Sequence, residues 1–293
     1  MRVLRGSIPA LVTPFCDEAF DEAAFRALID WQIDEGSHGL VPCGTTGESA
    51  TLTAEEHYRV VEVCIEQAAG RVPVIAGCGS NSTAVAIQNV KAAEERGADA
   101  GLVVLPYYNR PNQEGIYAHF AAVAAASALP VIVYNVPGRT VTDITPETMG
   151  RVAALPNVVG IKDASGDMTR VSAHRALCGP DFIQLSGNDD MALGFLGMGG
   201  VGTISVTANV APRLFAQFHE AFLSGDLAAA HTLQDRLFPL HKALFSDASP
   251  GPVKYALNRV RPDIPAGLRL PMTPPSQASR KAVDAALAYA GLV

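Results

Sequence analysis

Lys162 is the residue of this chain best placed for covalent chemistry. It follows directly on residues 158–161, a short apolar run typical of a buried strand. Desolvation at such a strand end disfavours a charged ammonium, and a neutral lysine amine can attack a ketone to form a Schiff base. Lys162 could equally reach the rim of the sheet and pair with Asp163. The chain has only five lysines, and we expect the other four to lie on solvated helix surfaces: Lys91, Lys242, Lys254 and Lys281.

Three further groups could assist a Schiff-base lysine. Tyr134 ends the apolar run before that of Lys162 and could pass protons beside the amine, although a strand-end tyrosine is commonly a packing residue. The small-residue turn Gly-Thr-Thr-Gly-Glu at 44–48 opens a helix, so its backbone N–H groups could hold a carboxylate or merely form a tight turn. Arg139 lies in the loop after Tyr134, where a guanidinium can clamp a carboxylate or simply be solvated.

Short apolar runs that alternate with amphipathic stretches must position these groups. Runs that are continuously apolar and rich in Val and Ile suit strands buried on both faces of a parallel sheet. Eight strand–helix units in about 225 residues predict an α/β fold, a (β/α)8 TIM barrel, whose chemistry sits at the carboxyl ends of the strands. A doubly wound sheet is the alternative, since alternation alone does not separate the two. The expected strands are 8–12, 39–41, 74–76, 101–105, 131–134, 158–161, 183–185 and 202–206.

Helix signals divide the chain into two regions. Thr53 and Glu56 have the spacing of a capping box that starts a helix. The alternating pattern stops after Ser224, and no convincing strand follows. We therefore expect a catalytic barrel at 1–225 and a helical region packed on it at 226–293. The helical stretches expected in the second region are 226–245, 252–260 and 276–289.

Composition and charge exclude several classes of protein. With 48% hydrophobic residues among 293, the chain can bury a large core, which argues against disorder. A net charge of −7 argues against nucleic acid or an anionic membrane as partner. The five cysteines form no C-x-x-C pair, so we expect free thiols and a cytoplasmic location. No apolar stretch is long enough to span a bilayer, and no histidine pattern indicates a metal site.

Four short motifs occur in order along the chain. They are Gly-Thr-Thr-Gly-Glu at 44–48, Tyr-Tyr-Asn-Arg-Pro at 107–111, Tyr-Asn-Val-Pro-Gly-Arg-Thr at 134–140 and Gly-Ile-Lys at 160–162. Together they resemble the dihydrodipicolinate synthase branch of the pyruvate-dependent class I lyases. The resemblance runs nearly end to end. It implies condensation of pyruvate with L-aspartate 4-semialdehyde to 4-hydroxy-tetrahydrodipicolinate, in lysine and diaminopimelate biosynthesis, with no cofactor beyond the covalent pyruvate imine on Lys162.

The resemblance implies a role for each matching residue. Lys162 would form the Schiff base with the ketone of pyruvate, and Tyr134 would shuttle protons during imine and enamine formation. Thr45 and Tyr108 would complete the proton relay, with Tyr108 reaching into a neighbouring subunit's site. Arg139 would hold the carboxylate of aspartate semialdehyde. The residues implied to line the pyruvate pocket are Thr46, Gly187 and Ile204.

The resemblance also implies a homotetramer built from tight dimers, and a feedback site for lysine in the inhibited members. Here Ala54 stands where a histidine is common, and Val85 stands where a glutamate contacts the inhibitor's amine. Burying an ammonium without its carboxylate partner is costly, so we expect weak or no inhibition by lysine. The positions that do match the feedback site are Ser49, Ala50, His57, Asn81 and Tyr107.

Two other functions remain open. A different pyruvate-dependent class I aldolase of the same superfamily, such as a sialic-acid, keto-deoxy-sugar or hydroxy-oxoglutarate lyase, would use the same lysine with another aldehyde. Arg139 distinguishes the synthase from these other aldolases, since their branches usually lack an arginine at the matching place. A catalytically silent barrel that binds a small acid is the third possibility. The intact set of Lys162, Tyr134, Thr45 and Tyr108 argues against it.

Overall fold

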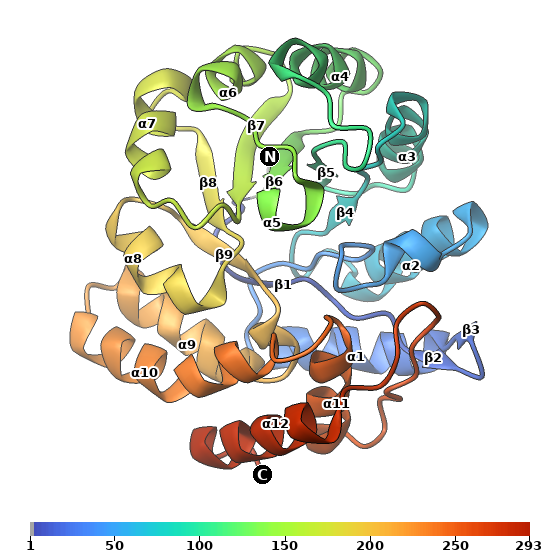
Figure 1. Cartoon of the computed structure of the whole chain (residues 1–293), viewed down its shortest axis with the longest axis vertical. Coiled ribbons are helices and arrows are strands. Elements are labelled where there is room, and N and C mark those ends of the chain that lie inside the picture. Colours follow the sequence, from blue (N-terminus) through green and yellow to red (C-terminus); the bar gives the residue numbers. More distant parts are fainter. Residues whose placement is uncertain (1–2) are drawn as a thin grey trace.

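A parallel sheet curled into a barrel forms the centre of the computed structural model, which describes residues 3–293 (Figure 1). Seven strands lie in the order β1-β9-β8-β7-β6-β5-β4. Because neighbouring strands pair in parallel, their carboxyl ends meet at one end of the barrel. The prediction of an α/β barrel is confirmed. Of the region 1–225 that was expected to form it, residues 1 and 2 lie outside the described part of the chain. The strands are β1 (Gly6–Pro9), β4 (Ile75–Gly77), β5 (Ala100–Val104), β6 (Val131–Asn135), β7 (Val158–Asp163), β8 (Ile183–Ser186) and β9 (Gly202–Ser205).

Residues 39–41 close the barrel between β1 and β4 through two isolated bridges and the backbone hydrogen bonds around them, without forming a regular strand. Ala10 bridges to Val41 and Leu40 bridges to Val74, both in parallel. The prediction of a full strand here was therefore wrong, although the segment occupies the eighth position of the barrel wall. A proline follows Val41 directly and has no N–H with which to extend the ladder.

Helices cover the outside of the barrel wall (Figure 1). The predicted capping box is present, since Thr53 Oγ1 accepts from the Glu56 N–H at 3.2 Å and the Glu56 carboxylate accepts from the Thr53 N–H at 3.0 Å. None of the helices within residues 3–293 is long and apolar enough to cross a membrane. The helices up to residue 225 are α1 (Glu22–Asp34), η1 (Ser49–Thr51), α2 (Ala54–Ala68), α3 (Thr83–Glu95), α4 (Gln113–Ala125), α5 (Pro137–Thr140), α6 (Pro146–Ala153), α7 (Thr169–Cys178), η2 (Asp189–Met191), α8 (Ala192–Gly197), η3 (Thr207–Asn209) and α9 (Pro212–Leu223).

The core has two parts, one on each face of the barrel wall. Alternate side chains of a strand point to opposite faces, so one strand can contribute to both parts. In β6, Val131 and Val133 pack outward against the helices. Ile132 and Tyr134 pack inward, in an inner cluster that fills the barrel. This alternation decides which strand residues can reach a site inside the barrel.

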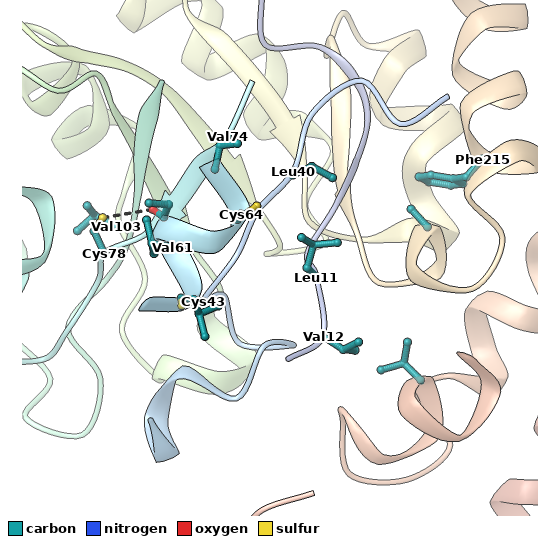
Figure 2. Packing of buried hydrophobic residues seen from close by; sticks show 14 of the residues in the cluster. Leu11, Val12, Leu40, Cys43, Val61, Cys64, Val74, Cys78, Val103 and Phe215 are labelled. Atoms are coloured by element: carbon teal, nitrogen blue, oxygen red, sulfur yellow. Dashed lines mark hydrogen bonds between the residues drawn. The ribbon is translucent and has the colours of Figure 1, made fainter. Parts of the chain in front are cut away.

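All five cysteines are free thiols, as predicted. Cys43, Cys64 and Cys78 are buried in the outer part of the core (Figure 2). Burial raises the pKa of the Cys78 thiol to about 12 and also raises the pKa of Cys43 and of Cys64. Since the thiolate is the reactive form, these three residues pack as small apolar side chains and are not nucleophiles.

The C-terminal helical region, residues 226–293, lies against one side of the barrel (Figure 1). Its helices are α10 (Leu227–Ala243), α11 (Gly251–Val260) and α12 (Gln277–Ala290), within two residues of the predicted stretches. Helix α10 packs on α9 and α12. The chain after α11 lies beside a small hairpin that the sequence did not predict, β2 (Phe15–Cys16) and β3 (Ala19–Phe20).

Candidate active site

Lys162 and Tyr134 lie side by side at the carboxyl ends of β7 and β6. Their Cα atoms are direct register partners. The Lys162 Nζ lies 4.0 Å from the centroid of the Tyr134 ring. Only 6% of Lys162 and 7% of Tyr134 is exposed. The structure thus places a desolvated amine against the face of a tyrosine, which is the pairing predicted from the two strand ends.

Asp163 turns to the other face of β7 and does not pair with Lys162. It faces α7, where Arg170 Nε lies 3.3 Å from its Oδ2. Both Asp163 and Arg170 are buried. The alternative in which Lys162 pairs with Asp163 was therefore wrong, because successive side chains of a strand point to opposite faces. Within residues 3–293, Lys162 has no ion-pair partner.

Arg170 also connects the lysine strand to the loop that carries Arg139. Its Nη1 lies 2.9 Å from Asp143 Oδ1, an atom that also accepts a 2.8 Å hydrogen bond from Asn135 Nδ2. Asp143 follows α5, the short helix that contains Arg139. Sequence reasoning missed Arg170 because no motif marks it. The signal available was Asp163, since a buried carboxylate requires a partner.

Gly187 and Ile204 come from the next two strands of the wall. Gly187 follows β8, and a Cβ atom there would lie 3.1 Å from the Lys162 Cε and 2.6 Å from the Ala164 Cβ. Only a residue without a side chain lets Lys162 extend along this backbone. Ile204 of β9 is buried in the inner cluster together with Tyr134.

The turn at 44–48 follows the closing segment of the barrel. Thr13 Oγ1 donates a 2.7 Å hydrogen bond to Gly47 O. A Cβ atom on Gly47 would lie 2.9 Å from a backbone carbonyl oxygen of the chain after β1, so the turn packs against the barrel without space for a side chain. Thr46 is buried in this turn, whereas Thr45 is exposed. The structure therefore brings the turn to the same end of the barrel as Lys162.

Arg139 and Tyr108 are exposed on the loops after β6 and β5. Arg139 lies within α5 and has no ion-pair partner among residues 3–293. Tyr108 is 90% exposed and has a φ of 68°, in the left-handed region that a side chain rarely adopts. In a single chain, the Tyr108 ring therefore lies away from Lys162 and Tyr134.

The residues that the resemblance assigns to a lysine-feedback site come from four neighbouring segments. His57 lies on α2, where its Nε2 donates a 2.8 Å hydrogen bond to Gly77 O at the end of β4. Burial lowers the pKa of His57, so its ring is neutral. Asn109 Nδ2 donates a 2.8 Å hydrogen bond to Asn81 O, which joins the loops after β4 and β5. The whole set comprises Ser49, Ala50, His57, Asn81 and Tyr107.

Lys254 is fully buried, so the prediction of a solvated position was wrong for this lysine. It lies on α11, forms an ion pair with Glu48 and donates a 2.6 Å hydrogen bond to Gly267 O. Burial lowers the pKa of Lys254 to about 8, against the opposing effect of Glu48. The helical pattern could not reveal this, because both partners are distant in sequence. The other three lysines are exposed as predicted: Lys91, Lys242 and Lys281.

Comparisons with known proteins agree with the resemblance of the four motifs. Residues 3–290 match the model of the dihydrodipicolinate synthetase family. The 4-hydroxy-tetrahydrodipicolinate synthase of Rhizorhabdus wittichii is 71% identical over 287 residues, 98% of this chain and 99% of the relative.

Solved structures show the same likeness in three dimensions. The chloride-inhibited dihydrodipicolinate synthase from Acinetobacter baumannii, complexed with pyruvate, is 43% identical with a TM-score of 0.96, and the match covers 99% of this chain and 100% of that one. The enzyme from Cyanidioschyzon merolae with lysine bound is 38% identical with a TM-score of 0.95, covering 99% of both chains. This chain therefore belongs to the dihydrodipicolinate synthetase family.

Proposed function

We propose that the chain is a 4-hydroxy-tetrahydrodipicolinate synthase, a lyase that condenses pyruvate with L-aspartate 4-semialdehyde. The observation that carries this proposal is the buried Lys162 amine, 4.0 Å from the centroid of the Tyr134 ring. A relative of that name that is 71% identical over almost the whole chain supports the choice of reaction.

The reaction starts at Lys162 Nζ, which attacks the pyruvate ketone and releases water to form an imine. Loss of a proton from the pyruvate methyl group gives an enamine, whose terminal carbon attacks the aldehyde of the second substrate. The amine of that substrate then displaces Lys162 Nζ and closes the ring.

Tyr134 carries protons to and from these intermediates, with Thr45 and Tyr108 as its relay partners. Residues 3–293 of a single chain contain no hydrogen bond between Thr45 and Tyr134, and the exposed Tyr108 has nothing to pack against. A second copy of the chain would bring its Tyr108 to this site. The active form is accordingly a tight dimer, and two such dimers form the tetramer.

The carboxylates of the two substrates take different partners. Thr46 and the backbone of the turn at 44–48 hold the carboxylate of pyruvate, in a pocket that Gly187 and Ile204 line. Arg139, which has no ion-pair partner within residues 3–293, clamps the carboxylate of the semialdehyde. This arginine favours the synthase over the aldolases that act on sugar aldehydes.

Borohydride trapping tests the Schiff base. The protein is incubated with pyruvate and borohydride, and the reduced adduct is located by peptide mass. We expect a single adduct on Lys162. The absence of an adduct, or an adduct on Lys254, would overturn the assignment.

A substrate panel tests the second substrate. Turnover with aspartate semialdehyde should exceed turnover with sugar aldehydes. Arg139→Ala should raise the KM for the semialdehyde roughly ten- to a hundredfold, because a hydrogen bond to a charged group contributes roughly 1.5–3 kcal/mol. The KM for pyruvate should hardly change, and Arg151→Ala on the exposed face of α6 is the matched control. Equal effects of Arg139→Ala on both substrates contradict the role assigned to it.

We also propose that lysine inhibits this enzyme weakly or not at all. Ala54 is exposed at the start of α2, and Val85 on α3 is 41% exposed. Neither side chain can pair with the ammonium of a bound lysine. Steady-state assays with added lysine test this, and strong inhibition at sub-millimolar lysine would contradict it.

The reaction as proposed uses no cofactor other than the imine on Lys162. Among residues 3–293, no three His, Cys, Asp or Glu side chains gather closely enough to hold a metal ion. Activity should therefore survive dialysis against a chelator, and its loss, restored by a metal ion, would contradict the proposal. A cytoplasmic location stays a prediction.

A further inference from the structure

Glu48, the last residue of the turn at 44–48, is buried against a lysine of the C-terminal helical region. Its carboxylate forms an ion pair with Lys254, and the two side chains are 2% and 0% exposed. A buried charge is stable only when it is paired, so each of these residues depends on the other. The pair joins the turn to α11, which lies outside the barrel wall.

Both oxygens of the Glu48 carboxylate are held from the C-terminal helical region. Oε1 faces Lys254 Nζ, and Oε2 accepts a 3.2 Å hydrogen bond from the Arg269 N–H. Lys254 Nζ is itself held in place by its 2.6 Å hydrogen bond to Gly267 O. The Glu48 carboxylate is thus oriented by the Lys254 ammonium group and by the backbone of residues 267–269.

Arg269, in the same stretch of backbone, also binds residues that follow the turn at 44–48 in the sequence. The Arg269 guanidinium donates hydrogen bonds of 2.6 and 2.7 Å to Glu56 on α2, and one of 3.1 Å to Thr51 O in η1. Lys254 Nζ and the Arg269 guanidinium each lie 4.3 Å from the centroid of the Phe15 ring. Phe15, before the turn, and Glu56, after it, are therefore both in contact with Arg269 of the C-terminal region.

A displacement of Glu48 would pass directly to the threonines of the turn. Glu48 has a φ of 55°, in the left-handed region, and its N–H donates a 3.1 Å hydrogen bond to Thr45 O. Gly47, next to Glu48, packs closely against the barrel, since a Cβ atom added there would lie 2.9 Å from a carbonyl oxygen. The position of Thr46 therefore depends on where the Glu48 carboxylate is held.

We propose that Lys254 is a positioning residue for the pyruvate site, which holds the turn at 44–48 in its binding geometry through Glu48. This inference rests on the proposed function, because it assumes that Thr45 and Thr46 act on pyruvate. The C-terminal helical region then takes part in pyruvate binding by holding this turn, without contacting the substrate.

Lys254→Met in the full chain tests the proposal, with exposed Lys281→Met on α12 as the matched control. The pyruvate concentration that half-saturates borohydride labelling of Lys162 should rise about tenfold, since small misplacement of a binding group is costly. The KM for the semialdehyde should change less than about twofold, because Arg139 lies on a different loop. A purely structural role would lower the folded fraction and leave both of these concentrations unchanged.

The variant Glu48→Gln/Lys254→Met covers the case in which the single variant does not fold. It removes both charges, so no unpaired buried charge remains, and the Gln amide oxygen can still accept the Arg269 N–H. We expect it to fold and to keep the raised half-saturating pyruvate concentration. Parent-like pyruvate binding in this variant overturns the proposal. Failure of the parent itself to form an adduct on Lys162 overturns the proposed function, which is a separate result.

Discussion

Replacement of Arg170 by methionine should weaken the fold more than any exposed ion pair can. Arg170 is 7% exposed and lies behind β7, the strand that carries Lys162, with its Nε 3.3 Å from Asp163 and its Nη1 2.9 Å from Asp143. Methionine keeps much of the aliphatic stem and removes only the charge and the donors. The change therefore isolates the electrostatic part of the contact.

The expected magnitude follows from the exposure of the two acids. The Asp163 side chain is 4% exposed and would lose its cationic partner, keeping the 2.7 Å hydrogen bond from the Ser165 N–H; breaking a buried ion pair in this way costs about 3–5 kcal/mol. The Asp143 side chain is 48% exposed, so water can replace the guanidinium there at small cost. We expect the free energy of unfolding to fall by about 3–5 kcal/mol, mainly through Asp163.

Urea unfolding monitored by circular dichroism measures this free energy. Arg151→Met is the matched control, since its ion pair with Glu114 has side chains 45% and 72% exposed. That variant should lose less than about 1 kcal/mol. The double variant Asp163→Asn/Arg170→Met should recover part of the loss, because it leaves no buried charge unpaired.

A loss below about 1 kcal/mol in Arg170→Met would refute this reasoning. It would mean that the hydrogen bond from the Ser165 N–H, or water, is enough to stabilise the Asp163 carboxylate once the guanidinium is removed. A double variant less stable than Arg170→Met would refute it equally, because the cost would then not lie in the unpaired carboxylate.

Three further predictions concern single positions in or beyond the site. Gly187→Ala places a Cβ 2.6 Å from the Ala164 Cβ and 3.1 Å from the Lys162 Cε. It should therefore lower the free energy of unfolding by about 1–3 kcal/mol and slow the borohydride labelling of Lys162. Labelling at the rate of the parent protein would contradict this. Val141 has a φ of 59°, in the left-handed region. Val141→Gly should raise the melting temperature, because the relief of about 1–2 kcal/mol of backbone strain exceeds the entropic cost of a glycine. A lower melting temperature would contradict this prediction. Burial lowers the pKa of His219 from 6.5 to about 3, so its ring is neutral in the folded state and takes a proton on unfolding. The free energy of unfolding should therefore fall as the pH falls from 6.5 toward 3. His219→Phe should make this pH dependence less steep. An unchanged slope of the unfolding free energy against pH would contradict the prediction.

The proximity of Lys162 and Tyr134 could be predicted because it depends on local patterns. Continuous Val and Ile runs indicate buried parallel strands, and the carboxyl ends of such strands in a barrel meet at one end. Lys162 and Tyr134 end neighbouring runs, so their proximity follows from the order of the strands. The capping box of Thr53 and Glu56 was predictable for the same reason, since its partners are three residues apart.

Partners distant in sequence could not be predicted in this way. Arg170 looks like any helical arginine until β7 turns Asp163 toward it. Lys254 looks like a surface lysine until the chain after α11 covers it and brings it to Glu48. The closing segment 39–41 has the composition of a strand, yet forms isolated bridges in place of a regular ladder.

The sequence by itself predicted the type of chemistry and the elements that carry it. One lysine after a buried strand, a tyrosine on the strand before it and an arginine in the loop after that tyrosine allowed Schiff-base chemistry, and the resemblance of the four motifs favoured it. Only the tertiary structure decided which charges are paired: Asp163 with Arg170, and Glu48 with Lys254. The physical reason is that the burial of a charge depends on every element that packs over it, whereas strand and helix patterns record only near neighbours in the chain.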